Sequence, residues 1–347
     1  MTETKSIING DNHSKAGKQT ILLISMLILL IAVVLAALVI GAIPTNLSDF
    51  FSSGTDRALE RTVLVEIRTP RVVLAALVGA ALSISGAALQ GMFRNPLADP
   101  GLIGVSSGAA VGALAMIVFG TGLAVADQWL PYLVPVSAVA GASVVTMFLY
   151  AFSRRYGNFS VTTMLLAGIA INALATVAIG AFEFVSDDRQ LRTLIFWLMG
   201  SFGRATWPAV LPTVIVVGTS VVLMLQLARP LDVLQLGEAD ARFLGVDVPR
   251  LKKRIIVLAA AAVGAGVAVS GIITFIGLVV PHLVRLLGGA SHRYVLLGSI
   301  LLGASLAVAA DVIARIVIMP AELPVGLVTS AMGAPFFLWL IARRRPA

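Results

Sequence analysis

Long runs without charge constrain this chain more than any other feature. Nine stretches of 17 to 30 residues contain no Asp, Glu, Lys or Arg. A helix of about 20 apolar residues spans the hydrocarbon layer of a membrane, because each residue adds about 1.5 Å. With 59% hydrophobic and 12% charged residues, a soluble chain of 347 residues could not bury its apolar surface. The sequence therefore predicts an all-α, polytopic membrane protein, with uncharged stretches at 19–48, 72–93, 100–126, 128–153, 156–182, 205–228, 255–284, 294–310 and 323–342.

Basic residues at both ends indicate an even number of spans. Three lysines precede residue 19 and three arginines follow residue 342, and connectors rich in Lys and Arg face the cytoplasm. Two cytoplasmic termini require an even number of spans, so one more span is needed beside the nine stretches. The central stretch 255–284 carries Gly271 near its middle, and splitting it there gives ten spans with an outward turn at 270–274. We expect the two halves to be short and sheltered by neighbouring helices.

The ten-span topology sorts the charges as a membrane protein should. It places 17 of the 25 basic residues inside, including every lysine, and 8 outside. Residues 1–18 then form a cytoplasmic tail and residues 19–347 a single transmembrane domain. The net charge of +8 reflects the cytoplasmic face, and a nucleic-acid partner is not needed to explain it.

Catalytic and metal-binding patterns are missing from the sequence. Cysteine is absent, which excludes disulfides and thiolate chemistry. His13, His282 and His292 do not stand with carboxylates at metal-ligand spacing. No phosphate-binding Gly-x4-Gly-Lys-Ser/Thr loop occurs, so ATP-driven transport would need a separate ATPase chain. We expect no catalytic residue, no metal and no cofactor bound by this chain.

The spans hold few polar groups. Ion-coupled secondary carriers usually place ionisable residues at mid-membrane, and these spans lack them, which disfavours but does not exclude that class. Asn172, Thr176, Gln90 and the pair 106–107 are polar candidates for a translocation pathway. For each of them an interhelical hydrogen bond is favoured over a contact with the substrate.

The inner connector 229–254 predicts a docking surface. Pro230, Gly237, Gly245 and Pro249 punctuate it, with short helical pieces between them. A solvated loop does not need exposed apolar side chains, whereas a protein contact does. The residues that form this face, with an i,i+4 ion pair beside it, are Leu236, Ala239, Phe243, Glu238 and Arg242.

A shift of 224 residues exposes a faint internal repeat. It places 79–82 (Gly-Ala-Ala-Leu) on 303–306 (Gly-Ala-Ser-Leu), and Pro96 and Pro100 on Pro320 and Pro324. The second and ninth spans run in opposite directions, so the repeat would be inverted, as in many transporters.

Several longer strings resemble the FecCD permeases of bacterial ABC importers, from about Arg68 to the C-terminus. They are 68–71 (RTPR), 79–90 (GAALSISGAALQ), 94–101 (RNPLADPG), 104–109 (GVSSGA), 196–201 (FWLMGS), 244–246 (LGV), 275–282 (FIGLVVPH), 309–311 (AAD), 322–326 (ELPVG) and 333–335 (GAP).

The resemblance implies a subunit of the bacterial inner membrane with ten helices. It implies a homodimer or paired permease, two ATP-binding subunits that hold ATP-Mg, and a periplasmic or lipid-anchored substrate-binding protein. The cargo it implies is an iron chelate, a ferric siderophore or haem, with cobalamin as the alternative. An ion-coupled carrier remains the alternative from another class.

The resemblance also implies roles for particular residues. Arg68, Arg71 and Arg315 match outer-face arginines that meet carboxylates of the binding protein. An inner gate is expected at the start of the fifth span, and the inner connector 229–254 is expected to be the coupling segment that contacts the ATPase. The gate and pathway residues are Ser160, Val161, Thr162, Thr163 and Asn172. The coupling residues are Leu236, Gly237, Glu238, Ala239, Arg242, Phe243, Leu244 and Gly245.

Overall fold

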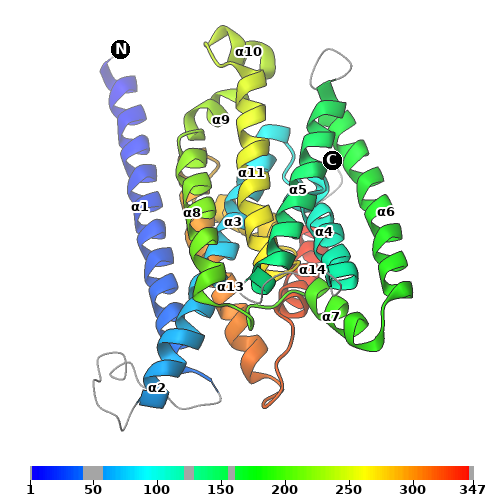
Figure 1. The fold of residues 1–347 in the computed structure, drawn as a ribbon. Coiled ribbons are helices and arrows are strands. Elements are labelled where there is room, and N and C mark those ends of the chain that lie inside the picture. The colour runs from blue at the N-terminus through cyan, green and yellow to red at the C-terminus, as the bar shows by residue number, and fades with distance from the viewer. Residues whose placement is uncertain (1, 42–57, 121–128, 155–160, 344–347) are drawn as a thin grey trace.

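The structure is a computed structural model that describes residues 2–41, 58–120, 129–154 and 161–343, and within these ranges every regular element is a helix (Figure 1). The helices that match predicted spans are α1 (Thr2–Val39), α3 (Thr69–Phe93), α4 (Val105–Phe119), α5 (Leu130–Arg154), α6 (Val161–Val185), α8 (Trp207–Leu225), α11 (Val248–Ser270), α12 (Ile276–Gly288), α13 (His292–Ile316) and α14 (Val325–Arg343). The shorter pieces are α2 (Ala58–Thr62), the π-helix η3 (Val63–Arg68), the 3₁₀ turn η4 (Pro100–Ile103), α7 (Asp188–Leu198), α9 (Ala228–Leu234) and α10 (Glu238–Phe243).

The all-helical membrane fold is confirmed. Among the described residues, seven helices are long and apolar enough to cross a membrane, and three shorter apolar helices complete the ten predicted spans in order. The split at Gly271 is correct, because this residue ends α11 with a φ of 71°. The expectation of two short halves holds only for α12, since α11 begins at Val248, before the uncharged stretch.

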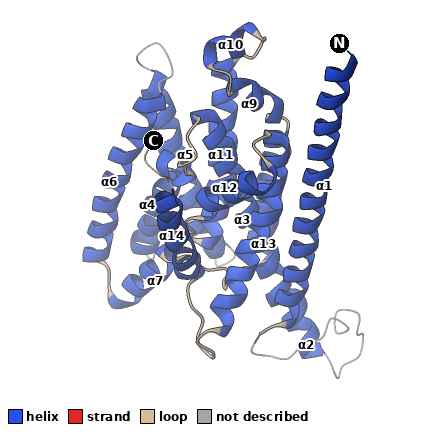
Figure 2. Cartoon of the chain, turned by 180° about the vertical axis from the view of Figure 1, so that it is seen from behind, coloured by secondary structure: helices blue, strands red, loops and turns tan. Residues whose placement is uncertain are grey.

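Helix α3 forms the centre of the bundle. Its residues 78–92 are all buried, and it packs against α8, α11, α12 and α13. By contrast, α1 and α6 lie at opposite edges in both views (Figures 1 and 2), and few of the residues in their spans are buried. An exposed apolar helix is stable in lipid, so this exposure is expected of a membrane protein.

Glycines bring α3 against two of its neighbours. A methyl group on Gly79 would overlap the carbonyl oxygen of Gly303 in α13, and one on Gly86 would overlap that of Gly277 in α12. Small residues allow such close packing between membrane helices, where it supplies much of the association energy.

The contact between α3 and α13 is antiparallel, as expected for a second and a ninth span that run in opposite directions. Residue numbers rise on α3 as they fall on α13, because Gly79 meets Gly303 and Ser83 donates to the carbonyl of Ser299. The 224-residue shift carries Gly79 onto Gly303 itself. It also carries 69–93 onto 293–317, one residue from the bounds of α13. A two-fold relation between the halves would therefore pass through this glycine contact.

The two ends of the bundle differ. The start of α1 and the short helix α10 lie at one end, and α2 and α7 at the other (Figure 1). This agrees with a topology in which residues 1–18 and 229–254 share one side. Residues 2–18 continue α1 as helix. The assignment of that side to the cytoplasm stays a prediction from charge.

Candidate functional site

The connector between α8 and α11 folds into an elbow, residues 228–247, built from α9 and α10. Gly237 and Gly245 adopt φ values of 126° and 86°, which glycine tolerates and other residues avoid. The chain therefore turns at both ends of α10, as predicted. Arg242 and Glu238 approach to 3.8 Å on its surface.

The tip of the elbow is apolar and open. The Phe243 side chain is 89% exposed, Leu236 64% and Leu244 62%, and Ala239 is exposed beside them. Ala241 is the buried member of α10. Helix α10 projects from the end of the bundle (Figure 1), so these side chains lie beyond the spanning helices. An apolar patch presented outside the membrane is typical of a protein contact.

Polar contacts fix the elbow to three spanning helices. On α9, Asp232 Oδ1 accepts a hydrogen bond from the backbone N–H of His292 at 2.8 Å and lies 2.7 Å from its ring Nδ1. The Asp232 carboxylate thus caps the N-terminus of α13, where the helix dipole favours negative charge. One turn later, Gln235 Nε2 donates to the carbonyl of Gly91 at the end of α3 (2.9 Å).

The third contact comes from α10. The ammonium of Lys252, whose side chain is 3% exposed on α11, donates to Glu238 Oε1 at 2.5 Å. A buried ammonium needs such a partner, because an unpaired charge in the interior costs several kcal/mol. A displacement of the elbow would therefore be transmitted directly to α3, α11 and α13.

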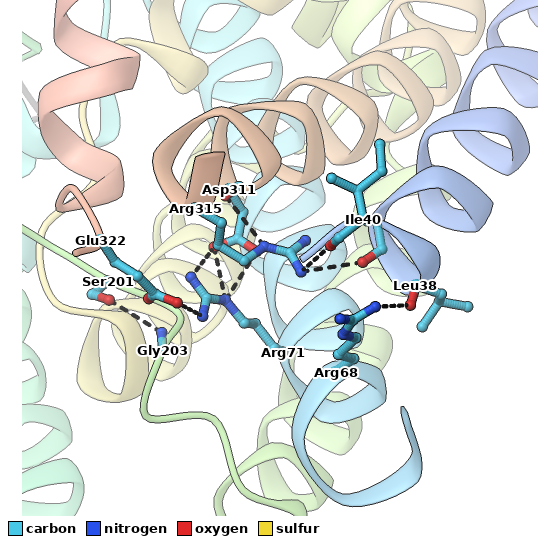
Figure 3. Close-up of polar contacts among 10 residues, drawn as sticks. Leu38, Ile40, Arg68, Arg71, Ser201, Gly203, Asp311, Arg315 and Glu322 are labelled. Atoms are coloured by element: carbon cyan, nitrogen blue, oxygen red, sulfur yellow. Dashed lines mark hydrogen bonds and ion pairs between the residues drawn. The ribbon is translucent and has the colours of Figure 1, made fainter. Parts of the chain in front are cut away.

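At the opposite end of the bundle, a cluster of ionised side chains joins α3, α13 and the connector that follows α13 (Figure 3). Arg71 Nε lies 3.0 Å from both carboxylate oxygens of Asp311, and Arg71 Nη1 lies 3.0 Å from Glu322 Oε1. Arg315 Nε lies 3.2 Å from Asp311 Oδ2. Asp311 is fully buried, and its two arginine partners make that burial tolerable.

Two arginines of this region also cap the last turn of α1. Arg68 Nη1 donates to the carbonyls of Leu38 and Val39, both at 2.7 Å, and Arg315 Nη1 donates to those of Ala37 and Ile40 at 3.1 and 3.3 Å. The carbonyl end of a helix carries partial negative charge and unpaired acceptors, which guanidinium groups satisfy.

The three arginines matched to binding-protein docking are largely buried in this chain. Arg68, Arg71 and Arg315 are only 5 to 7% exposed. Their acceptors lie within the chain, at the end of α1 and on Asp311 and Glu322. Glu322 is the accessible member of the cluster, with 47% of its side chain exposed. A role in binding-protein docking stays a prediction.

The predicted gate lies at the start of α6 and is described only in part. Ser160 lies outside the described residues, and α6 begins at Val161. Thr162 is exposed and Thr163 half-buried. These positions leave the gate untested.

Asn172 contacts neighbouring elements of its own chain. Its Oδ1 accepts from Ser107 Oγ of α4 at 2.6 Å, and its Nδ2 donates to the carbonyl of Gly101 in η4 at 3.3 Å. This is the interhelical hydrogen bond left open as the alternative to a pathway contact. The exposed face of α6 is apolar instead, with Leu166, Leu174 and Val177 between 62 and 71% exposed.

Gln90 has a similar structural role. Its Nε2 donates to the carbonyls of Gly277 and Leu278 at 3.4 and 3.3 Å, and its Oε1 accepts from Arg285 Nη1. Pro281 has no N–H to offer the Gly277 carbonyl four residues before it, so Gln90 fills that vacancy. This contact ties α3 to α12.

The loop before η4 carries one perturbed carboxyl. Burial raises the pKa of Asp99 above its usual range, and a hydrogen bond from Gly101 N–H (2.8 Å) opposes that rise. The same bond caps η4. No group of three or more His, Cys, Asp or Glu side chains in the described ranges could hold a metal ion.

Four residues of these sites were missed by the sequence analysis: Asp232, Gln235, Lys252 and Glu322. Asp232 and Gln235 stand three apart on α9, a spacing that marks one helical face and could have suggested a shared contact. The partners of Lys252 and Glu322 lie on other elements, and no local pattern points to them.

Comparison with known proteins places the chain in a transporter family. The model of the FecCD transport family matches residues 28–343. The Hemin transport system permease protein HmuU of Yersinia pestis is 45% identical over 322 residues, which cover 92% of this chain and 95% of that protein. The Cobalamin import system permease protein BtuC of Halobacterium salinarum is 44% identical over 287 residues, covering 82% of this chain and 74% of that protein.

One further relative and one solved structure extend the likeness over nearly the whole chain. The Vitamin B12 import system permease protein BtuC of Vibrio parahaemolyticus is 38% identical and covers 97% of each chain. A solved structure, an inward-facing conformation of a metal-chelate type ABC transporter, superposes with a TM-score of 0.82 at 32% identity. That superposition covers 92% of this chain and 98% of the solved one.

Proposed function

This chain belongs to the FecCD transport family, and we propose that it is the permease subunit of an ATP-driven importer in a bacterial inner membrane. In this role it moves an iron chelate, haem or a ferric siderophore, from the periplasm or cell exterior to the cytoplasm. It is a multi-pass membrane protein and a permease, and ATP hydrolysis belongs to two separate ATPase subunits.

One observation carries the coupling mechanism: the exposed apolar tip of the elbow is fixed to three spanning helices. Phe243, Leu236 and Leu244 offer an apolar surface to an ATPase. Asp232, Gln235 and Glu238 transfer any displacement to α13, α3 and α11. ATP binding in the partner would favour one position of the elbow. The spanning helices would follow, because their contacts with the elbow differ between its two positions.

The transport pathway requires a second permease copy. Helix α6 exposes an apolar face along its length, and a symmetric pair of such faces would enclose a pathway on a two-fold axis. A wall of small and apolar residues suits a bulky chelate, because it offers no strong binding site that would retain the cargo. The gate at Ser160, Val161, Thr162 and Thr163 would close this pathway at its inner end.

The choice of cargo rests on the relatives. The relative named for hemin transport is 45% identical over nearly its whole length, whereas those named for cobalamin or vitamin B12 import are 44% identical over a shorter span or 38% identical over the whole. We therefore place haem first among iron chelates and keep cobalamin as the alternative.

Uptake into vesicles tests the proposal. The permease is reconstituted with its ATPase and binding protein, and radiolabelled haem, a ferric siderophore and cobalamin are offered in turn. We expect ATP-dependent uptake of an iron chelate. Uptake driven by an ion gradient in the absence of ATP would instead show an ion-coupled carrier, and uptake of cobalamin alone would reassign the cargo.

A further inference from the structure

A basic groove lies beside the elbow, between the last turns of α8 and the first turns of α11. Its volume is about 610 Å³. Apolar side chains line one end of it and three cations stand at the other. The lining residues that matter here are Leu223 of α8 and Arg250, Lys253, Arg254, Val257 and Leu258 of α11.

The three cations share one face of α11. Arg250, Lys253 and Arg254 stand at i, i+3 and i+4, and all three are exposed. Arg250 pairs with Asp247 at 3.1 Å, which neutralises it in part. Among the described residues, no carboxylate pairs with Lys253 or Arg254. Lys253 Nζ lies 6.0 Å from the ring centroid of Tyr150 on α5, at the outer limit of a cation–π contact. Two positive charges are thus left for a ligand.

The groove changes character along the helix. One turn beyond Lys253 and Arg254, the same face of α11 presents Val257 and Leu258, and Leu223 of α8 faces them. Val257 is 52% and Leu223 40% exposed. One helical turn rises about 5.4 Å, which is the step from a membrane interface into its hydrocarbon. Cations followed by an apolar channel match a molecule with an anionic head and apolar chains.

We propose that this groove binds an anionic phospholipid of the inner leaflet. Its phosphate contacts Lys253 and Arg254, and an acyl chain lies along Val257, Leu258 and Leu223. The groove opens at the flank of two spanning helices at the end of the bundle that carries the elbow. A lipid bound there would brace the elbow against the membrane, because α11 carries both Lys252, which holds Glu238, and the two lipid-binding cations.

Native mass spectrometry of the purified full chain in detergent tests the site. Phosphatidylglycerol is the probe, phosphatidylcholine the neutral comparison and inorganic phosphate the competitor. We expect one tightly held phosphatidylglycerol per chain, little phosphatidylcholine, and no displacement by millimolar phosphate, since phosphate lacks the acyl chains.

Variants assign the binding to the groove. Each basic side chain near an anionic headgroup contributes about fivefold in affinity, so Lys253→Gln with Arg254→Gln should weaken phosphatidylglycerol binding by roughly 25-fold. The control, Arg189→Gln with Arg192→Gln, removes two equally exposed charges from α7 at the other end and should change nothing. Val257→Asn should weaken lipid binding without altering charge.

Specific results would overturn the proposal. Equal losses in the two double variants, equal binding of phosphatidylcholine, displacement by phosphate, or full binding by Val257→Asn would each do so. Where the double variant fails to insert, Arg254→Gln alone should show about a fivefold loss, and its absence would count against the site.

Discussion

At the scale of single residues, the structure reveals the partners of the charged side chains, which the sequence alone does not. The pattern of Lys and Arg predicted which connectors share a side. It could not predict that Arg71 would bury itself against Asp311, because the two stand 240 positions apart and only packing of α3 on α13 joins them. Asp232 was missed for the same reason, since its partner begins α13. Local spacing reveals helical faces but not which helix lies opposite.

The Arg68→Glu substitution tests docking of a binding protein. Reversing this charge should weaken association at low salt. An attractive pair between Arg68 and a carboxylate of the binding protein would be replaced by two carboxylates, which repel each other. The substitution also removes two hydrogen bonds to the end of α1, so insertion and thermal stability must be measured beside affinity. Arg189→Glu, an exposed reversal on α7, serves as the control. Unchanged affinity for reversals of Arg68, Arg71 and Arg315 would eliminate the docking role.

The Asp232→Ala substitution tests the contact between elbow and α13. It removes the hydrogen bonds to His292, a loss of about 1 kcal/mol for a partly exposed acceptor. We expect fewer cargo molecules moved per ATP, because the elbow loses one of its three attachments. Asp240→Ala, on the same elbow and exposed, should leave that ratio unchanged. Equal effects of the two substitutions would remove Asp232 from the coupling route.

At the scale of helices, the sequence predicted the membrane spans well, because the thickness of the hydrocarbon layer sets the length of each apolar stretch. The ten spans appear in the predicted order, and the turn at Gly271 lies where one glycine interrupts a long apolar stretch. The errors lie at helix ends. Helix α11 extends back to Val248 because the Asp247 carboxylate caps it through the backbone N–H of Arg250 and Pro249 stands in its first turn. A count of uncharged residues does not detect such a start. Helix α1 likewise extends through the polar residues before its apolar run.

The Gly79→Ala substitution tests the crossing of α3 and α13. The new methyl group would overlap backbone of Gly303, and the helices must separate, at a cost of about 1–3 kcal/mol. Gly218→Ala in α8 meets nothing within 4 Å and should leave stability unchanged or raise it by up to about 1 kcal/mol. Thermal unfolding in detergent compares the two. Equal stability of both variants would show that the glycine crossing does not hold the bundle.

Cysteine substitution tests the gate at the start of α6. The chain has no native cysteine, so single cysteines at Val161 or Thr162 report without background. If two copies meet there, each variant should crosslink between subunits in one nucleotide state of the ATPase and not in the other. Crosslinking that is independent of nucleotide would argue against a gate at this position.

At the scale of the whole molecule, the elbow and the arginine cluster mark opposite ends of one bundle. Their polar contacts converge on α3 and α13, the pair that crosses at Gly79 and Gly303. A displacement at the elbow therefore acts on the helices whose far ends carry Arg71 and Asp311. The family followed from sequence motifs and the order of the spans from uncharged stretches. This convergence required the structure, because it depends on contacts between distant segments.

The central claim is that the elbow couples ATP hydrolysis to transport. It is tested most directly by measuring ATPase activity and cargo uptake on the same reconstituted complex. Ala239→Arg places a bulky charge on the exposed apolar tip, and Phe243→Ser removes its most exposed side chain. The control is Leu59→Ser, which removes a side chain that is 66% exposed on α2, at the end of the bundle opposite the elbow.

Both elbow variants should insert and fold normally, because the altered side chains are exposed. We expect their uptake to fall about tenfold or more, as loss of a central apolar contact does at protein interfaces, while ATP hydrolysis persists or becomes independent of cargo. Leu59→Ser should transport normally. Normal uptake and normal ATPase association in Ala239→Arg would contradict the account.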